Sequence, residues 1–165
     1  MKEQLKIILG IDPGYGSCGY GIIKKDDKFP DVLKWGCIKT TPKTGEPQDR
    51  LLVIFQKIEE LIINYGPTSM SIEKLFFSRN TTTALQVSEA KGVILLAAAK
   101  HQIPVFEYTP KQVKLAITGS GNADKKQMQM MITRILHLTE IPTPDDAADG
   151  LSLALCHMNW IRDLR

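Results

Sequence analysis

One short segment constrains the fold more than any other part of the chain. Residues 6–12, KIILGID, form an apolar, β-branched run that ends at Asp12, directly before Pro13 and Gly14. Such a run, closed by a turn-forming dipeptide, is typical of a strand inside a sheet. This strand therefore carries a carboxylate at the end of a buried element, where an uncompensated charge is costly.

The rest of the chain alternates strand-like and helix-like patterns. Runs at 19–25 and 32–40 follow the first strand and predict a three-stranded antiparallel meander. The other predicted elements are helices at 47–65, 82–102, 111–117, 123–138 and 145–163, and strands at 69–77 and 104–110. This order predicts an α/β protein with a five-stranded mixed sheet flanked by helices. Without a linker, repeat or low-complexity tract, residues 1–165 are expected to form a single domain.

Composition excludes membrane-spanning and disulfide-rich classes. No stretch of 18 apolar residues is present, so no membrane span is expected. The three cysteines are odd in number and lack metal-ligand spacing, and the N-terminal segment lacks a signal-peptide cleavage site. We therefore expect reduced cysteines and a cytoplasmic protein.

Charge is distributed unevenly along the chain. The net charge is only +3, which permits nucleic-acid binding without arguing for it. Residues 111–126 hold four lysines and one Asp around a Gly-rich loop, whereas residues 144–149, PDDAAD, are acidic. A basic approach beside an acidic site suits a phosphate substrate that also needs a metal ion.

Four carboxylates occupy positions that are unusual for surface acids. Asp12 ends an apolar strand, and Glu73 lies inside the predicted strand 69–77. Asp146 and Asp149 are three residues apart, so both project from one face near the start of the last helix. Burying such acids together is costly unless cations compensate them, and a hard, oxygen-binding ion such as Mg²⁺ is the natural partner. Two metal ions about 4 Å apart can bind the attacking water and the leaving oxygen of a phosphodiester.

Each acid also has an ordinary structural explanation. Asp12 can be a turn residue before Pro-Gly, Glu73 can face solvent on an edge strand, and acids at a helix start interact favourably with the helix dipole. Asp145 is a competing metal ligand, although only Asp146 has the i, i+3 relation to Asp149. The dipole explains neither Asp12 nor Glu73.

Four landmarks together resemble the RuvC family of Holliday junction resolvases. They are IDPG at 11–14 with GYG at 19–21, IEKLFF at 72–77, FEYTPKQVK at 106–114 and DDAADGLSLALCH at 145–157. They occur in the family's order and spacing over nearly the whole chain. The resemblance implies a ribonuclease-H-like fold and a homodimeric endonuclease of DNA recombination and repair. It also implies symmetric nicking of two opposed strands of a four-way DNA junction, which leaves ligatable 5′-phosphate ends.

The resemblance assigns the acids and the cofactor. Asp12, Glu73, Asp146 and Asp149 match the catalytic, metal-binding acids of the family. It implies Mg²⁺, with Mn²⁺ as a substitute and two ions in each active site. A branch-migration complex of RuvA and RuvB is implied as a partner by the family alone.

Basic and aromatic residues match positions that contact DNA in the family. Lys114 and Lys125 match residues that approach the cleaved phosphate, where they could stabilise charge in the transition state. Phe76 matches an aromatic near the junction centre, where it could stack on a base. Solvated lysines and a core phenylalanine are the alternatives, with Phe77 the better core candidate. The residues expected to contact DNA are Phe76, Arg79, Lys111, Lys114, Gly119, Gly121 and Lys125.

Three other functions stay open at this point. A nuclease of the same fold could act on RNA, although Phe76 and the basic segment 111–126 disfavour this. DPGYGSCGYG at 12–21 resembles a phosphate loop of actin-like or sugar-kinase-like ATPases, which are longer and have a second domain. A non-catalytic junction-binding module would be expected to lack one acid, and all four are present.

Overall fold

A five-stranded mixed sheet forms the centre of the computed structural model, which describes residues 6–26, 29–76 and 81–163. The strand order is β3-β2-β1-β4-β5. β1 to β3 form the predicted antiparallel meander, and β4 and β5 continue the sheet in parallel with β1. The strands are β1 (Ile7–Asp12), β2 (Ser17–Lys24), β3 (Asp31–Lys39), β4 (Ser69–Glu73) and β5 (Val105–Tyr108). The predicted α/β class and five-stranded mixed sheet are confirmed.

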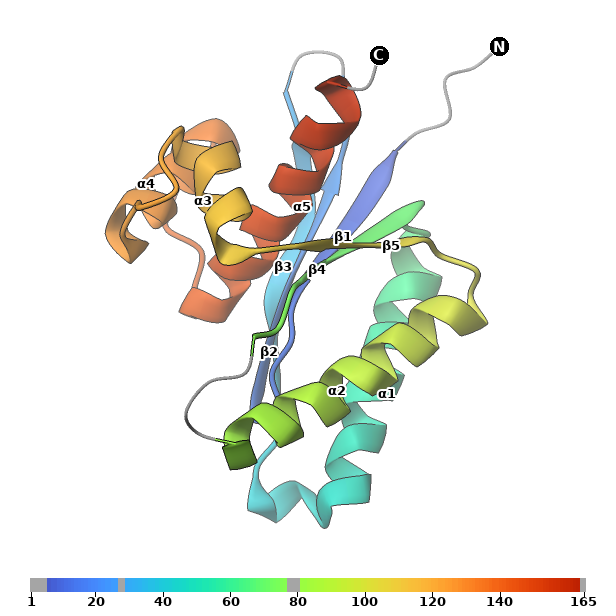
Figure 1. Cartoon of the computed structure of the whole chain (residues 1–165). Coiled ribbons are helices and arrows are strands. Elements are labelled where there is room, and N and C mark those ends of the chain that lie inside the picture. Colours follow the sequence, from blue (N-terminus) through green and yellow to red (C-terminus); the bar gives the residue numbers. More distant parts are fainter. Residues whose placement is uncertain (1–5, 27–28, 77–80, 164–165) are drawn as a thin grey trace.

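Helices cover both faces of this sheet (Figure 1). One core cluster joins the sheet to α1 and α2, and a second joins it to α3, α4 and α5. The helices are α1 (Pro47–Tyr65), α2 (Thr81–Lys100), α3 (Pro110–Thr118), α4 (Lys125–Ile135) and α5 (Asp145–Asp163), and a short 3-10 helix, η1, spans Pro42–Thr44. Within the described ranges, no helix combines the length and apolar character needed to cross a membrane.

The prediction for β4 was too long. It extended this strand to residue 77 with Glu73 in its interior, whereas β4 ends at Glu73. The reason is its pairing, because Glu73 is opposite Tyr108, the last residue of β5. The N–H of Lys74 still donates to the backbone oxygen of Tyr108 at 2.8 Å, and the ladder ends there. Glu73 therefore lies at the carboxyl end of a strand.

The parallel register brings two of the predicted acids to the same edge of the sheet. Ile11 of β1 is opposite Ile72 of β4. The residues that follow them, Asp12 and Glu73, therefore end adjacent strands. In open sheets with parallel strands, the carboxyl ends are where ligands usually bind.

Glycines allow α5 to lie directly on β1 and β2. A Cβ atom on Gly10 would lie 2.1 Å from the backbone oxygen of Gly150, and one on Gly19 would lie 1.8 Å from that of Asp146. Glycine is the residue that permits such close approach of two backbones. Since Gly19 is also opposite Asp12 in the β1–β2 ladder, this contact places the first turn of α5 beside the end of β1.

We predict that Gly10→Ala destabilises the protein, because the added methyl group would force α5 away from β1. The expected loss in the free energy of unfolding is about 1–3 kcal/mol, the usual cost of overpacking. Urea unfolding followed by circular dichroism measures it. Gly16→Ala is the matched control, since a Cβ at Gly16 would have its nearest neighbours at 3.8 Å. Equal unfolding midpoints for the two variants would contradict the prediction.

Candidate active site

Three carboxylates converge where β1 meets the start of α5. Asp12, Asp146 and Asp149 each offer one oxygen atom, and these atoms lie within 4.8 Å of one another. All three residues are half-buried. A set of oxygen ligands at this spacing suits a hard divalent cation. This acidic cluster is therefore able to bind a metal ion.

The electrostatics of the cluster show how unfavourable these acids are without a cation. Burial, with the charges of Glu73, Asp149 and Asp146, raises the pKa of Asp12 from 3.8 to about 8. Burial also raises the pKa of Glu73 and of Asp149. The charge of Lys125 lowers the pKa of Asp12 and Asp149 but does not cancel the increase. Excess buried acid of this kind is what a bound cation would neutralise.

Glu73 lies beside the three aspartates but outside their tight set. It lines a cavity of about 230 Å³ together with Asp149, Lys114 and Lys125. Its charge is the largest contribution, after burial, to the raised pKa of Asp12. The structure thus brings all four predicted acids to one end of the sheet, with Glu73 on the side facing α3 and α4.

Asp145 and Asp146 point to different partners. Asp145 accepts hydrogen bonds from Lys125, at 2.7 Å from its Nζ atom, and from Gln129, at 2.8 Å from its Nε2 atom. The bond from Lys125 holds the pKa of Asp145 below its ordinary value. Asp146 instead joins the acidic cluster and accepts a hydrogen bond from Ser17. The geometry therefore favours Asp146 over Asp145 as the candidate metal ligand.

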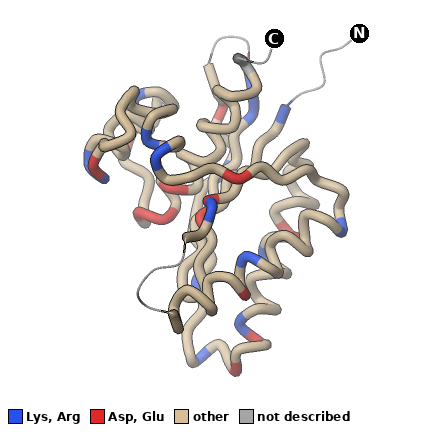
Figure 2. Tube along the Cα trace, in the orientation of Figure 1, with Lys and Arg blue, Asp and Glu red and all other residues tan. Residues whose placement is uncertain are grey.

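The two lysines expected near the cleaved phosphate line the cavity that holds Glu73. Lys114 projects from α3, and its charge lowers the pKa of Glu73. Lys125 is the first residue of α4 and is paired with Asp145. Figure 2 shows basic segments of α3 and α4 beside acidic segments at the start of α5. The predicted basic approach to an acidic site is therefore present in three dimensions.

The other residues expected in this region have local structural roles. Gly119 ends α3 with a left-handed backbone conformation, at φ 76°. A Cβ at Gly121 would lie 2.8 Å from Cγ of Lys111, so this glycine makes room for the lysine side chain. Lys111 itself is exposed. These local roles are sufficient to account for both glycines, and they are compatible with a phosphate backbone that passes nearby.

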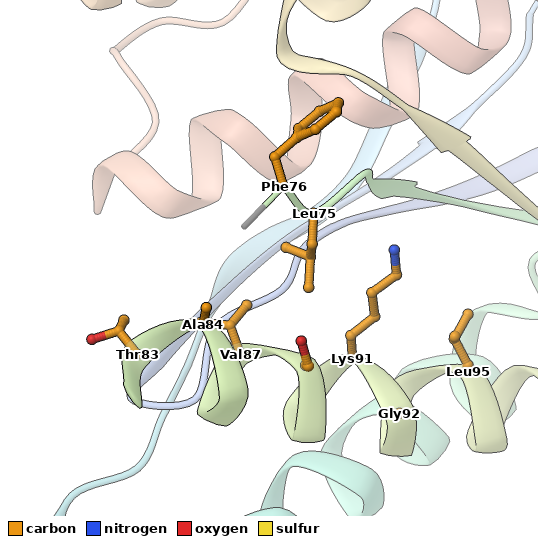
Figure 3. Close-up of a pocket in the computed structure, with 9 residues that line it drawn as sticks. Leu75, Phe76, Thr83, Ala84, Val87, Lys91, Gly92 and Leu95 are labelled. Carbon is orange, nitrogen blue, oxygen red and sulfur yellow. The ribbon is translucent and has the colours of Figure 1, made fainter. Parts of the chain in front are cut away.

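Phe76 is exposed, so the alternative that it is a core residue is wrong. Its side chain is 63% exposed. In Figure 3, Phe76 points away from α2, whereas Leu75 points toward it. Leu75 is partly buried, and both residues line a cleft of about 430 Å³ with Ala84 and Val87. Phe77 and Arg79, the other residues singled out in this segment, lie outside the described residues.

Ser17 and Cys37 were missed by the sequence analysis. The Ser17 hydroxyl donates to Oδ2 of Asp146, and Sγ of Cys37 lies 2.9 Å from Oγ of Ser17. Ser17 and Asp146 are 129 positions apart in the chain. Only the position of Ser17 near the IDPG segment could have drawn attention to it.

Comparisons with known proteins identify the family. The family model for the crossover junction endodeoxyribonuclease RuvC matches residues 8–157. The chain belongs to this family. The RuvC of Alkaliphilus metalliredigens (strain QYMF) is 52% identical over 151 residues, which cover 92% of each chain. The RuvC of Petrotoga mobilis (strain DSM 10674 / SJ95) is 47% identical over 159 residues, covering 96% of this chain and 97% of the relative.

Solved structures agree with the fold. Thermus thermophilus RuvC in complex with Holliday junction substrate superposes with a TM-score of 0.90 at 33% identity, covering 96% of each chain. The yeast mitochondrial Holliday junction resolvase Ydc2, at 16% identity and a TM-score of 0.67, covers 95% of this chain and 81% of its own, and shares the fold. The predicted ribonuclease-H-like fold is confirmed, and membership of the RuvC family excludes the ATPase alternative.

We predict that the metal-free protein loses stability as pH rises. Asp12 has a pKa of about 8 in the folded chain and an ordinary value of 3.8 when unfolded, so the folded state binds more protons between these values. The free energy of unfolding should therefore fall from about pH 4 to about pH 8. Urea unfolding in the presence of EDTA measures this dependence. Asp12→Asn should make the slope shallower, with the raised pKa values of Glu73 and Asp149 supplying the rest, whereas Glu140→Gln, a change at an exposed loop residue, should leave it unchanged. Equal slopes in all three proteins would refute the assignment.

Proposed function

We propose that this protein resolves Holliday junctions as a homodimeric, metal-dependent endonuclease that nicks two opposed strands of a four-way DNA junction. The observation that carries the proposal is the cluster of Asp12, Asp146 and Asp149, whose oxygens lie within 4.8 Å of one another. Membership of the RuvC family supports the reaction, and the junction bound in the Thermus thermophilus complex supports the substrate. Symmetric nicks with ligatable 5′-phosphate ends are the proposed products.

Mg²⁺ is the proposed cofactor, with Mn²⁺ as a substitute and two ions in each active site. The donors fit, because Asp12, Glu73, Asp146 and Asp149 offer only carboxylate oxygens and three of them have raised pKa values. Bound there, the cations would activate water and stabilise the leaving 3′-oxygen of the phosphodiester.

The remaining side chains of the cavity would orient and stabilise the phosphate. Lys114 and Lys125 supply positive charge beside the acids, where charge develops during the reaction. Lys125 is bound to Asp145 through side chains that are 60% and 55% exposed. An ion pair this exposed contributes little, so Lys125 can exchange Asp145 for a phosphate at low cost.

The DNA would extend from this cavity across the exposed residues of α3 and the segment after β4. We propose that Phe76 stacks on a base near the junction centre, since its ring is exposed and such stacking contributes about 1–3 kcal/mol per base. Lys111, Gly119, Gly121 and Arg79 are proposed contacts to the sugar–phosphate backbone, which position DNA without reading its sequence. We also propose that the protein acts in the cytoplasm together with a branch-migration complex of RuvA and RuvB.

The proposed dimer surface is the outward face of α2. Ala90 and Ala97 on the inward face are buried in the core. On the outward face, Leu85 and Leu96 are 61% and 59% exposed, a large exposure for leucine on a helix. Ser88 and Gly92 lie between them at helical spacing, so this face combines two apolar side chains with small residues that permit close packing. A two-fold dimer would match the two-fold symmetry of the junction.

We predict that Asp146→Asn abolishes junction cleavage but retains junction binding, whereas Asp145→Asn retains both. Mutating a residue that only hydrogen-bonds to a metal ligand typically lowers activity by about 10–100-fold. Asp146→Asn changes a proposed ligand itself, so its loss of cleavage activity should exceed about 100-fold. The assay uses a labelled synthetic four-way junction, with linear DNA and RNA duplexes alongside, with and without Mg²⁺. Paired symmetric nicks only in the junction and only with metal support the proposal. No cleavage of the junction by the wild type, or equal cleavage of RNA, would reject it.

We predict that Leu96→Glu yields a monomer with impaired paired nicking, because the new charge would be buried at the proposed interface. Sedimentation velocity measures the oligomeric state. Leu52→Glu on α1 is the matched control, since Leu52 is similarly exposed, at 52%, on a different helix, and should leave the dimer intact. A monomeric wild type, or a dimer in both variants, would exclude this surface.

A further inference from the structure

A chain of three side chains links β3 to the acidic cluster. The Ser17 hydroxyl donates to Oδ2 of Asp146. Sγ of Cys37 lies 2.9 Å from Oγ of Ser17 and 4.0 Å from Oδ2 of Asp146. Ser17 begins β2, Cys37 is in β3, and Asp146 is in the first turn of α5. Three separate elements therefore meet at one carboxylate oxygen.

The chemistry of the groups fixes the direction of these hydrogen bonds. An ionised carboxylate can only accept, so the single hydroxyl proton of Ser17 is committed to Asp146. In the contact between Ser17 and Cys37 the Ser17 oxygen is then the acceptor and the thiol the donor; the thiol also has Oδ2 of Asp146 at 4.0 Å and the backbone oxygen of Ile38 at 3.8 Å as more distant acceptors. Donation from the thiol polarises the hydroxyl and strengthens its bond to Asp146.

The sheet holds both donors in place. Ser17 is opposite Lys39 and Cys37 is opposite Gly19 in the β2–β3 ladder. Ser17 and Gly19 are two residues apart on β2, so they face the same side of the sheet, the side where Gly19 meets the backbone of Asp146. The helix start and the hydroxyl are thus positioned by the same strand.

We propose that Ser17 is a positioning residue for the metal site: it holds one oxygen of Asp146 so that this carboxylate faces Asp12 and Asp149, and Cys37 supports it. The proposal rests on the proposed metal-dependent function. Without the hydroxyl, the Asp146 side chain could rotate about its own bonds, and the site would have to reorder it when a cation binds. Hydrogen bonds to ligating carboxylates are a common feature of metal sites, and losing one typically costs about 10–100-fold in metal affinity or activity.

The test measures Mn²⁺ binding to the intact protein without DNA, by electron paramagnetic resonance, for Ser17→Ala, Ser17→Thr and Cys37→Ala. Ser17→Ala should raise the Mn²⁺ dissociation constant by about 10–100-fold. Ser17→Thr keeps the hydroxyl and should restore most of the affinity, and Cys37→Ala should have a smaller effect than Ser17→Ala. Thr68→Ala is the control, since its hydroxyl donates to the backbone oxygen of Ile7, at the end of β4 opposite to Glu73, and not to an acid.

A double variant separates positioning from a general loss of structure. If Ser17 acts through Asp146, Ser17→Ala should cause no further loss of Mn²⁺ affinity in the Asp146→Asn background. Unchanged Mn²⁺ affinity in Ser17→Ala, or an additive loss in the double variant, would overturn the proposal. If the wild type binds Mn²⁺ but does not cut junctions, the proposed function fails while the positioning role is still decided by the binding data.

Discussion

The contact of α5 with β1 and β2 is the constraint on which the rest of the structure depends. Gly10 and Gly19 let the helix approach until backbone meets backbone, and Gly150 provides the matching space on the helix. Without this contact, Asp146 could not share a site with Asp12, whose strand neighbour is Gly19. The glycines that permit this packing therefore determine where the acidic cluster forms.

Bringing these acids together has an energetic cost that the rest of the site offsets only in part. Burial and mutual repulsion raise the pKa of Asp12 to about 8, although Lys125 acts in the opposite direction. Pairing of Lys125 with Asp145 keeps a cation at the edge of the cluster without neutralising it. The positive charges of the chain leave the cluster with excess negative charge, which a bound divalent cation could neutralise.

Much of the fold and of the site could be predicted from sequence, because the signals were local. Apolar periodicity gave the five strands and the major helices, and α1 was predicted with its observed bounds. The end of β4 was misplaced because its length depends on pairing with β5, a contact between distant segments. The sequence could not separate Asp145 from Asp146 for a similar reason. Side chains of adjacent helix residues point in different directions, and which one points toward the other acids depends on how the helix packs against the sheet.

By itself, the sequence determined the α/β class and, through its resemblance to the RuvC family, the four candidate acids, because periodicity and motif order are local features of the chain. The tertiary structure decided which acids form the tight set, that Phe76 is exposed, and that Ser17 and Cys37 belong to the site. These facts depend on strand register and on the approach of α5 to the sheet. The approach of α5 joins segments more than 100 positions apart, as the 129 positions between Ser17 and Asp146 illustrate, and the register of β1 with β4 pairs Ile8 with the distant Ser69. No local sequence pattern records either contact.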